Sequence, residues 1–599
     1  MSLTESLPRW DMQVVFPSLQ SSEFNSAVEN IEKGLDSLEE LFEARGIYKG
    51  GTGGIEVFDE VLNAYNKLAE QIRPVNAYIH AFTSTDSRDE TASAKNSEVD
   101  LYLARLRKLS KKYAAWVGGL DLDRLLEVSL VAQTHEYAVT KAKIVSEHQM
   151  SPEEESLASD MEITGLSAWS KLYDNTTSQL TVSIEFDGTT QDMPMSLLRS
   201  LAYDPDRSRR KNAFEAELAA WKKVEVPLSA AMNSIKGETL TLCNRRGWES
   251  PLDETLFNTN IDRQTLDAMM TAARESFPDF RRYMRAKAKA LGISKMAFYD
   301  LFAPIGESQA RWSYSKACEF VAEQFRSYSD KLGDFAERNY KENWIDAEPR
   351  PGKVDGAYCM GLRRDESRIL MNYKPSFGAV STLAHELGHG YHNYCLHGRT
   401  ATQRALPMTL AETASIFCET IIRQAVVKTG TAAEKFVVLE ASLQGSCQVV
   451  VDISSRFLFE SSMFEGRKKR ELSAREMCEH MRNAQLNTYG DGLAPDGLHP
   501  YMWAAKGHYY GRSFYNFPYM FGLLFGLGLY SVYQQDPEPF KARYDDLLSS
   551  TGMADAATLG RRFGIDITTP EFWRSSLHQI RADVDEFERL VDEGAAHPI

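Results

Sequence analysis

Two histidines four residues apart, His385 and His389, stand in the segment TLAHELGHGYH at residues 382–392. On a helix this spacing places both imidazoles on one face, one turn apart. Two imidazole nitrogens in that arrangement can bind one zinc ion. Glu386 follows His385 directly, so its carboxylate would lie beside the metal and accept a proton from a water molecule that the metal activates. The segment predicts a zinc-dependent hydrolytic site; a pair of hydrogen-bonded core histidines is the alternative interpretation.

A catalytic zinc ion needs a third protein ligand and one open position. His392 and His397 are possible ligands, but both follow too closely on the same helix to complete a tetrahedron easily. Glu412 is the better candidate, within residues 409–420 (TLAETASIFCET), which we expect to form a second helix. Glu419 is seven residues further on and shares its face, so it can orient a ligating histidine. The pattern favours Glu412 over Glu419 as the ligand without excluding the second.

Stabilisation of the transition state also needs a hydrogen-bond donor for the oxyanion that develops there. Residues 507–522 (GHYYGRSFYNFPYMFG) offer one histidine and four tyrosines: His508, Tyr509, Tyr510, Tyr515 and Tyr519. For each tyrosine, an aromatic core position is the alternative interpretation. His499 is a competing histidine in the glycine-rich loop 490–500, and loops of that kind are often functional.

The histidine helix is expected to follow a small sheet. Residues 356–359 and 367–373 have strand character and are joined by a turn at 363–366. Ser381 and Thr382 precede the histidines and are the expected N-terminal cap residues. Gly388 and Gly390 lie beside the two histidines, and they leave room for another backbone to approach closely.

The rest of the chain has a helical pattern. Apolar residues recur every three or four positions in stretches such as 24–45, 55–72 and 100–114. One further hairpin is expected, because residues 178–186 alternate polar and apolar side chains and Asp187-Gly188 follows as a turn. We predict a mostly α fold with a large helical body and a small β-sheet beside the zinc helix. A boundary near residue 200 would separate an N-terminal helical region, 1–200, from the catalytic region, 201–599.

Composition indicates which partners and which cellular compartment to expect. The 599 residues carry a formal charge of −16, which repels phosphate backbones, so nucleic acid is not an expected partner. The seven cysteines form no CxxC pair, and the N-terminus has no signal-peptide pattern; both features indicate a reducing, cytoplasmic location. Residues 514–533 are apolar but contain Asn516 and Pro518, which favours a buried helix over a membrane span. The pattern carries no information on oligomeric state.

Taken together, these motifs resemble the M3 family of zinc peptidases, in its oligoendopeptidase F branch, which is related to thimet oligopeptidase. The resemblance extends from Trp10 almost to the C-terminus. It is strongest between Gly356 and Gly522, through the histidine motif, the ETAS sequence at 412–415 and the histidine–tyrosine segment. HExxH alone is moderately specific, whereas HExxH with an ETAS helix at this spacing is strongly so.

The resemblance implies one zinc ion per chain, held by His385, His389 and Glu412, with Glu386 as general base. It also implies that His508, Tyr515 and Tyr519 approach the scissile carbonyl of the substrate. The branch often has a further tyrosine where this chain has Phe517, so the role of that hydroxyl is lost or moved, to Tyr509 or Tyr510.

The family fold has a deep channel that admits only extended oligopeptides. Gly356, Ala357 and Tyr358 are the expected edge for binding peptide by strand addition. Two alternatives are a helical zinc carboxypeptidase or dipeptidase with the same motif, and a catalytically silent peptide-binding protein.

Overall fold

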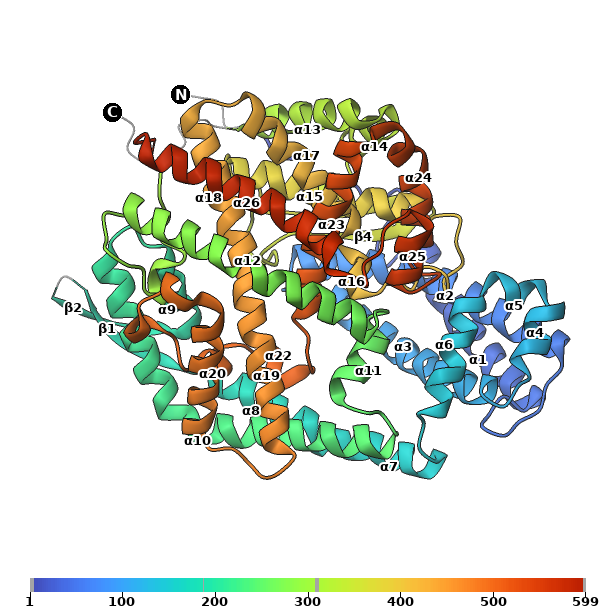
Figure 1. Cartoon of the computed structure of the whole chain (residues 1–599). Helices are drawn as coiled ribbons and strands as arrows, with labels where there is room; N and C mark the ends of the chain where they lie inside the picture. Colours follow the sequence, from blue (N-terminus) through green and yellow to red (C-terminus); the bar gives the residue numbers. More distant parts are fainter. Residues whose placement is uncertain (1–4, 187, 307–311, 596–599) are drawn as a thin grey trace. The chain divides into compact units, whose positions relative to one another are not determined.

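Helices make up nearly all of the regular structure in the computed structural model, which describes residues 5–186, 188–306 and 312–595 (Figure 1). The chain forms two units, each assembled from three separate stretches. Unit 1 comprises Met1–Gln149, Ala310–Gln424 and Val532–Gly564, and unit 2 comprises Met150–Gln309, Ala425–Ser531 and Ile565–Ile599. These units interleave along the sequence, whereas the sequence-based division at residue 200 separates two consecutive regions.

Unit 1 consists of helices and one three-stranded sheet. Its helices are α1 (Ser22–Arg45), α2 (Ile55–Thr85), α3 (Glu90–Val117), α4 (Leu122–Val128), α5 (Leu130–Thr134), α6 (Glu136–Glu147), α13 (Tyr314–Tyr328), α14 (Asp330–Lys341), α15 (Phe377–Cys395), α16 (Met408–Ala411), α17 (Thr413–Thr429, crossing into unit 2), α24 (Pro537–Ser550) and α25 (Ala556–Arg562). Its strands are β3 (Ile345–Asp346), β4 (Tyr358–Arg363) and β5 (Glu366–Leu370).

Unit 2 is likewise helical and carries one hairpin. Its helices are α7 (Pro152–Thr164), α8 (Leu166–Ser178), α9 (Met195–Ser200), α10 (Arg207–Arg245), α11 (Pro251–Asn258), α12 (Arg263–Ala290), α18 (Ala432–Cys447), α19 (Ile453–Arg467), α20 (Ala474–Tyr489), α21 (Met502–Ala505), α22 (His508–Gly511), α23 (Phe517–Gln535, crossing into unit 1) and α26 (Pro570–Asp592). Its strands are β1 (Thr181–Phe186) and β2 (Thr189–Pro194). A π-helical turn, η3 (Gln448–Asp452), joins α18 to α19, and short 3₁₀ turns occur at η1 (Leu201–Tyr203), η2 (Phe298–Asp300), η4 (Gly490–Gly492) and η5 (Pro495–Gly497).

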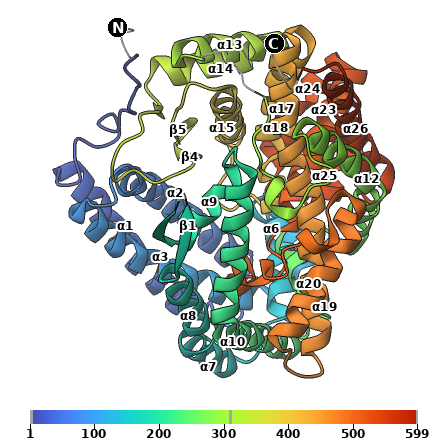
Figure 2. The same ribbon diagram turned by 90° about the vertical axis from the view of Figure 1, so that its left-hand side faces the viewer.

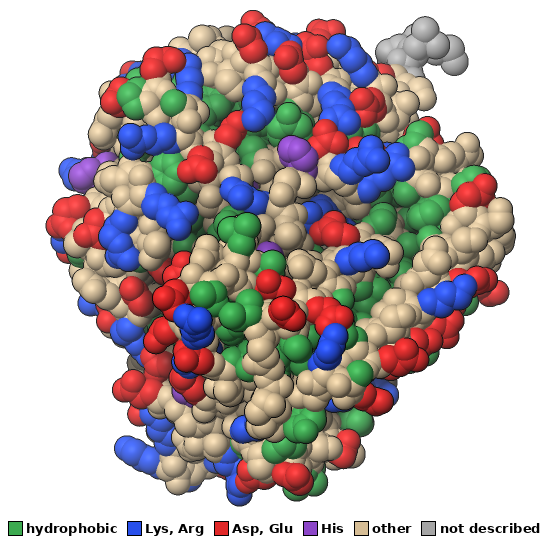
Figure 3. All heavy atoms as spheres, turned by 90° about the vertical axis from the view of Figure 1, so that its right-hand side faces the viewer, with side chains coloured by type: hydrophobic (Ala, Val, Ile, Leu, Met, Phe, Trp, Pro, Cys, Tyr) green, Lys and Arg blue, Asp and Glu red, His purple; other side chains and the backbone are tan. Residues whose placement is uncertain are grey.

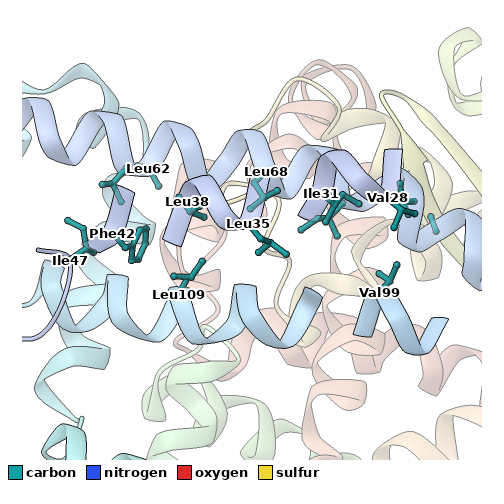
Figure 4. Packing of buried hydrophobic residues seen from close by; sticks show 14 of the residues in the cluster. Val28, Ile31, Leu35, Leu38, Phe42, Ile47, Leu62, Leu68, Val99 and Leu109 are labelled. Carbon is teal, nitrogen blue, oxygen red and sulfur yellow. The ribbon is translucent and has the colours of Figure 1, made fainter. Parts of the chain in front are cut away.

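The first helices of unit 1 show how the apolar period becomes a core. Helix α1 starts after Ser21, whose side chain accepts a hydrogen bond from the backbone N–H of Phe24. Its buried residues follow a three- and four-residue spacing, which forms one apolar stripe. Figure 4 shows Leu35 and Leu38 of this stripe and Leu109 of α3 pointing into the layer between the helices. The helical stretches expected here are confirmed and extend further than predicted.

The sheet of unit 1 lies beside α15 (Figure 2). Its strand order is β3-β5-β4, with β4 and β5 antiparallel and β3 parallel to β5. The predicted pair of strands and its turn are therefore confirmed, but the first strand begins at Tyr358 and not at Gly356. Strand β4 is an edge strand. The expected second strand, 367–373, is shorter in the structure and ends at Leu370. Beyond it the backbone N–H groups of Met371 and Tyr373 still donate to the carbonyls of Asp346 and Ala347.

In unit 2, the predicted hairpin is present, with β1 and β2 antiparallel and Phe186 opposite Thr189. Of its turn, Gly188 has φ of +76°, a conformation that glycine adopts without strain, and Asp187 lies outside the described residues. Helices α12 and α26 of the same unit pack side by side (Figure 2).

The apolar segment 514–533 contributes mainly to α23, whose residues are mostly buried. Among the described residues, one helical run, Ala432–Arg467, is long and apolar enough to cross a membrane, and 56% of its apolar window is buried inside the protein. That degree of burial is typical of a core helix. Acidic and basic side chains are interspersed on the face shown in Figure 3.

Candidate metal centre and active site

His385, His389 and Glu412 meet in unit 1, and one ligand atom of each lies within 4.8 Å of the others. Nε2 of His385 is 3.3 Å from Oε2 of Glu412, and Nε2 of His389 is 3.5 Å from the same oxygen. Two imidazole nitrogens and a carboxylate oxygen are the donor set of many catalytic zinc sites. The three side chains retain 23–24% exposure, so water can reach the cluster.

The local sequence explains why both histidines face the same point. They lie one turn apart on α15, whose N-terminal cap is Ser376, where the side chain accepts from the N–H of Ala379. The prediction that Ser381 and Thr382 cap this helix is wrong, because both lie inside it. Five residues before Ser381 the backbone is still extended at Ser376, and the helix begins there.

Glu412 stands at a break between two helices. The prediction of one helix over residues 409–420 is wrong in this detail, since α16 ends at Ala411 and α17 begins at Thr413. Glu412 has φ of −88° and ψ of 5°, between the two helical segments. Its Oε2 also accepts a hydrogen bond from Ser415 Oγ at 2.6 Å, which holds the carboxylate in place.

A glycine allows this break to come close to α15. A Cβ atom on Gly388 would lie 2.6 Å from Cα of Ser415 and 2.7 Å from the carbonyl oxygen of Ala414. The expected close backbone approach at Gly388 is therefore confirmed. Gly390 faces a side chain instead of a backbone, because a Cβ atom there would lie 3.1 Å from the ring of Phe335.

Glu419 contacts the opposite ring nitrogen of His385 and is not part of the three-residue cluster. Its Oε2 is 3.2 Å from Nδ1 of His385, and its Oε1 accepts a hydrogen bond from Ser381 Oγ at 3.0 Å. A carboxylate on Nδ1 places that proton and leaves Nε2 as the free donor atom toward the metal. The sequence left open whether Glu412 or Glu419 completes the cluster, and in the structure Glu412 is the one grouped with the two histidines. Ser381, one turn before His385, was missed as a partner because it was assigned to the cap.

The charges around the cluster favour a bound cation. Burial lowers the pKa of His385, but Glu412 and Glu419 outweigh it and raise the pKa to about 10. Burial raises the pKa of Glu412, yet the neighbouring His385 and His389 bring it down to about 2. The two carboxylates therefore stabilise positive charge at this point of the fold.

Glu386 lies on the same helix and is only 5% exposed. Its Oε2 is buried and has no hydrogen-bond partner among the residues that the structure describes. Burial, together with the charges of Glu412 and Glu419, raises the pKa of Glu386 to about 7 against the opposing effect of His385. A buried carboxyl group with a pKa near neutrality and a free oxygen can both take and return a proton.

The other histidines of this helix region are not part of the cluster. Nε2 of His392 lies 2.8 Å from Thr551 Oγ1 in the core, and Nδ1 of His397 lies 2.7 Å from the carbonyl oxygen of Tyr394. The cysteines are unpaired, and none joins the metal-binding group found among the described residues.

The predicted histidine–tyrosine group lies in unit 2. His508 and Tyr515 have ring centroids 4.8 Å apart, and the hydroxyl of Tyr519 donates to that of Tyr515 at 3.1 Å. The two hydroxyls and the imidazole thus form one local group. Tyr509 and Tyr510 belong to the apolar core of the same unit at 1% and 0% exposure, and Phe517 is also buried.

His499 is a core histidine. It is 1% exposed, and its Nε2 lies 3.2 Å from Oε1 of the buried Glu217. Its ring packs edge-on against Phe214 and Phe298. These contacts enclose His499, whereas His508 is exposed.

The predicted peptide-binding edge is Gly356, Ala357 and Tyr358. Tyr358 opens the edge strand β4, whereas Gly356 and Ala357 precede the strand, and Gly356 has φ of +82°. The hydroxyl of Tyr358 is hydrogen-bonded with Ser84 Oγ at 2.6 Å, and its ring lies against His80. These contacts fix the start of the strand within unit 1.

Comparison with known proteins assigns the class. The model of peptidase family M3 matches residues 200–579, and a model described as oligopeptidase F matches residues 132–181. The chain therefore belongs to peptidase family M3, a family of metallopeptidases, in its oligopeptidase F branch.

Individual relatives are distant but cover nearly the full length. The chain is 20% identical to oligopeptidase PepF of Bacillus subtilis, over 97% of this chain and 87% of that protein. It is 22% identical to an oligoendopeptidase F homolog of Lactococcus lactis, over 99% and 98%.

Solved structures show the same fold. A putative peptidase of Chlamydophila abortus superposes with a TM-score of 0.84 at 18% identity, covering 97% of this chain and 98% of that one. Oligoendopeptidase-F from Enterococcus faecium gives 0.70 at 18% identity, covering 95% and 99%.

Proposed function

We propose that this metallopeptidase is a zinc endopeptidase that hydrolyses internal peptide bonds of short, unfolded oligopeptides. The single observation that carries the proposal is the buried Oε2 of Glu386, which has no hydrogen-bond partner among the described residues, on the residue that follows His385 of the cluster His385, His389 and Glu412. The names of the relatives, oligopeptidase and oligoendopeptidase, support the substrate class.

The metal would be held by Nε2 of His385, Nε2 of His389 and Oε2 of Glu412, one ion per chain. When bound, zinc supplies a Lewis acid that polarises the scissile carbonyl and lowers the pKa of a water molecule. Glu419 and Ser415 act behind these ligands: Glu419 holds the proton on Nδ1 of His385, and Ser415 orients Glu412.

Glu386 is the proposed general base. Its Oε2 takes a proton from the attacking water and later delivers it to the nitrogen of the leaving amine. A pKa of about 7 suits both transfers, because the carboxyl group can change protonation state near neutral pH without a large energetic cost.

His508, Tyr515 and Tyr519 are the proposed groups that contact the peptide around the scissile bond. The support is the family resemblance of the segment and the local grouping of the three side chains in unit 2. A tyrosine hydroxyl is a suitable donor to an oxyanion in a site that excludes water.

Gly356, Ala357 and Tyr358 are the proposed edge for the extended substrate. An unpaired edge strand can hydrogen-bond a peptide backbone regardless of its side chains, which suits an enzyme acting on many oligopeptides. We also propose a cytoplasmic location, no binding of nucleic acid or membrane, and a catalytic region within 201–599.

The test is cleavage of an internally quenched peptide with both ends blocked. The peptide has about ten residues, so it can bind along the strand edge in extended form. Internal cleavage that stops with a chelator and returns with zinc is the expected result. A carboxypeptidase or dipeptidase with the same motif would cleave only a matched peptide with a free terminus. Binding without cleavage of either peptide in the presence of zinc would contradict peptidase activity altogether.

A further inference from the structure

A chain of buried polar groups runs behind His508 in unit 2. Nδ1 of His508 lies 3.0 Å from Oδ1 of Asn516, and Nη1 of Arg456 donates to the same oxygen at 3.1 Å. Nη2 of Arg456 donates to Asp452, whose other oxygen accepts from the hydroxyl of Tyr489 at 3.2 Å. Asn516, Arg456 and Asp452 are 4%, 7% and 6% exposed, so water does not compete for these bonds.

This chain determines which way the Asn516 amide points. A guanidinium group has only donors, so the atom of Asn516 that faces Arg456 must be the carbonyl oxygen and not the NH₂ group. Arg456 cannot turn away easily, because Asp452 holds it one helical turn back at the junction of η3 and α19. The identity of Oδ1 therefore follows from hydrogen-bond chemistry.

The same oxygen then determines the tautomer of His508. An amide oxygen only accepts, so Nδ1 must carry a proton to make its contact with Asn516. In neutral imidazole the other nitrogen, Nε2, consequently has a lone pair and no proton. Within the described residues the structure gives that Nε2 no hydrogen-bond partner, and the His508 residue is exposed.

We propose that Asn516 and Arg456 are positioning residues that keep the proton of neutral His508 on Nδ1, so that Nε2 accepts a hydrogen bond from a main-chain N–H of the bound peptide. This inference rests on the proposed function and assigns His508 a different duty from an oxyanion donor. Tyr515 takes the donor duty, since the hydroxyl of Tyr519 donates to Tyr515 and leaves the Tyr515 proton available for the substrate carbonyl.

The charges that face His508 favour its neutral form. Burial lowers the pKa of His508, and the hydrogen bond to Asn516 opposes this. Arg456 and Lys506 lower the pKa further, whereas Glu460 raises it, and the net result lies below the ordinary value. Arg512, on the same segment, lies over the ring of Tyr515, 5.8 Å from its centre.

The tautomer is measured directly by ¹⁵N NMR of the full-length, zinc-loaded enzyme with labelled histidine. The His508 signals are assigned by their loss in His508→Gln. We expect the proton on Nδ1 in the wild type, and a shift toward the Nε2-protonated form in Asn516→Leu. A proton found on Nε2 of the wild type would overturn the proposal. This readout needs no turnover, so it tests the tautomer even if peptide cleavage fails.

The pH dependence of kcat/KM tests the function of that tautomer. Asn516→Asp keeps an acceptor for Nδ1 but adds a negative charge, which raises the pKa of His508 by about one unit or more. If Nε2 must accept, activity is lost as pH falls through the pKa of His508. The general base Glu386 already contributes to the acidic limb, so in Asn516→Asp this limb should become steeper and move to higher pH as His508 joins it. Asn233→Asp is the matched control, a buried asparagine of the same unit at 4% exposure that contacts Leu472 and not His508, and its profile should stay in place.

An oxyanion donor would behave in the opposite way. If protonated His508 were the active form, Asn516→Asp would extend activity to higher pH, and that result would overturn the proposal.

Peptides N-methylated at one amide at a time give a third, independent measurement. The wild type should lose about tenfold or more in kcat/KM at one position, because methylation removes the hydrogen that Nε2 accepts. His508→Phe should show no such selective loss at that position. Equal sensitivity of both enzymes at every position would contradict a contact between Nε2 and a peptide N–H.

Discussion

Side chains of the proposed site occur in pairs, in which one residue belongs to the candidate metal cluster and a second one holds it in place. His385 faces Glu412 through Nε2 and Glu419 through Nδ1. The residues behind do no chemistry themselves, but they decide which nitrogen or oxygen is free.

At the residue scale, Glu386→Gln should lower turnover and leave metal binding unchanged. The amide keeps the shape of the side chain but cannot take a proton, so kcat should fall about 10²- to 10⁴-fold. Zinc content, measured by atomic absorption, should stay at one per chain, because Glu386 is not a ligand. A variant that retains most of its kcat would remove Glu386 as the base.

Glu419→Gln should weaken the metal site without removing a ligand. The amide no longer holds the Nδ1 proton of His385 as a charged acceptor, and zinc affinity should fall about 10- to 100-fold. Competition with a coloured chelator measures this affinity. Glu323→Gln, an exposed position on α13 of the same unit, is the control and should bind zinc as the wild type does. Unchanged affinity in Glu419→Gln would show that His385 is oriented by other groups.

Secondary-structure elements set the distances between these side chains. Helix α15 presents both histidines one turn apart, and the break between α16 and α17 brings Glu412 opposite them. The contact between these elements depends on Gly388, because Ser415 and Ala414 occupy the space of its absent side chain.

Gly388→Ala should therefore push the two elements apart. Overpacking against backbone atoms costs about 1–3 kcal/mol of stability, and the displaced Glu412 should also weaken zinc binding. Chemical denaturation of the variant and the wild type measures the change in stability. Equal stability of the two proteins would contradict a close-packed junction.

Gly378→Ala is the matched control, at an exposed position in the first turn of the same helix. A Cβ atom there would have Ser376 Oγ as its nearest neighbour, at 3.8 Å, which is an ordinary contact distance. This variant should be neutral or more stable by about 0.5–1 kcal/mol, because alanine favours the helix over glycine.

At the scale of the whole molecule, the three proposed metal ligands all belong to unit 1, so a bound metal should stabilise that unit against unfolding. Zinc at a concentration about 100-fold above its Kd contributes about 2.7 kcal/mol, or roughly 5 °C in Tm for a unit of this size. Differential scanning calorimetry with and without chelator should show one transition that moves. His385→Ala should melt at one temperature in both conditions, and a chelator effect of equal size in this variant would place the stabilising metal elsewhere.

Local sequence determined much of this protein. The three- and four-residue spacing of apolar residues predicted the helices. The four-residue spacing of His385 and His389 predicted that both imidazoles share one face, because residues one helical turn apart lie on the same side of any helix. The strand pair before α15 and the carboxylate at position 412 were also predicted from residues close in the chain.

Contacts between distant segments decided the rest. Glu412 and Glu419 are equivalent on a continuous helix, and only the break at Glu412 and the packing at Gly388 distinguish ligand from supporting carboxylate. Arg456 and Asn516 are 60 residues apart and meet only in the folded unit. No local period encodes such a pair, because a buried hydrogen bond depends on where two elements are brought together and not on the spacing within either one.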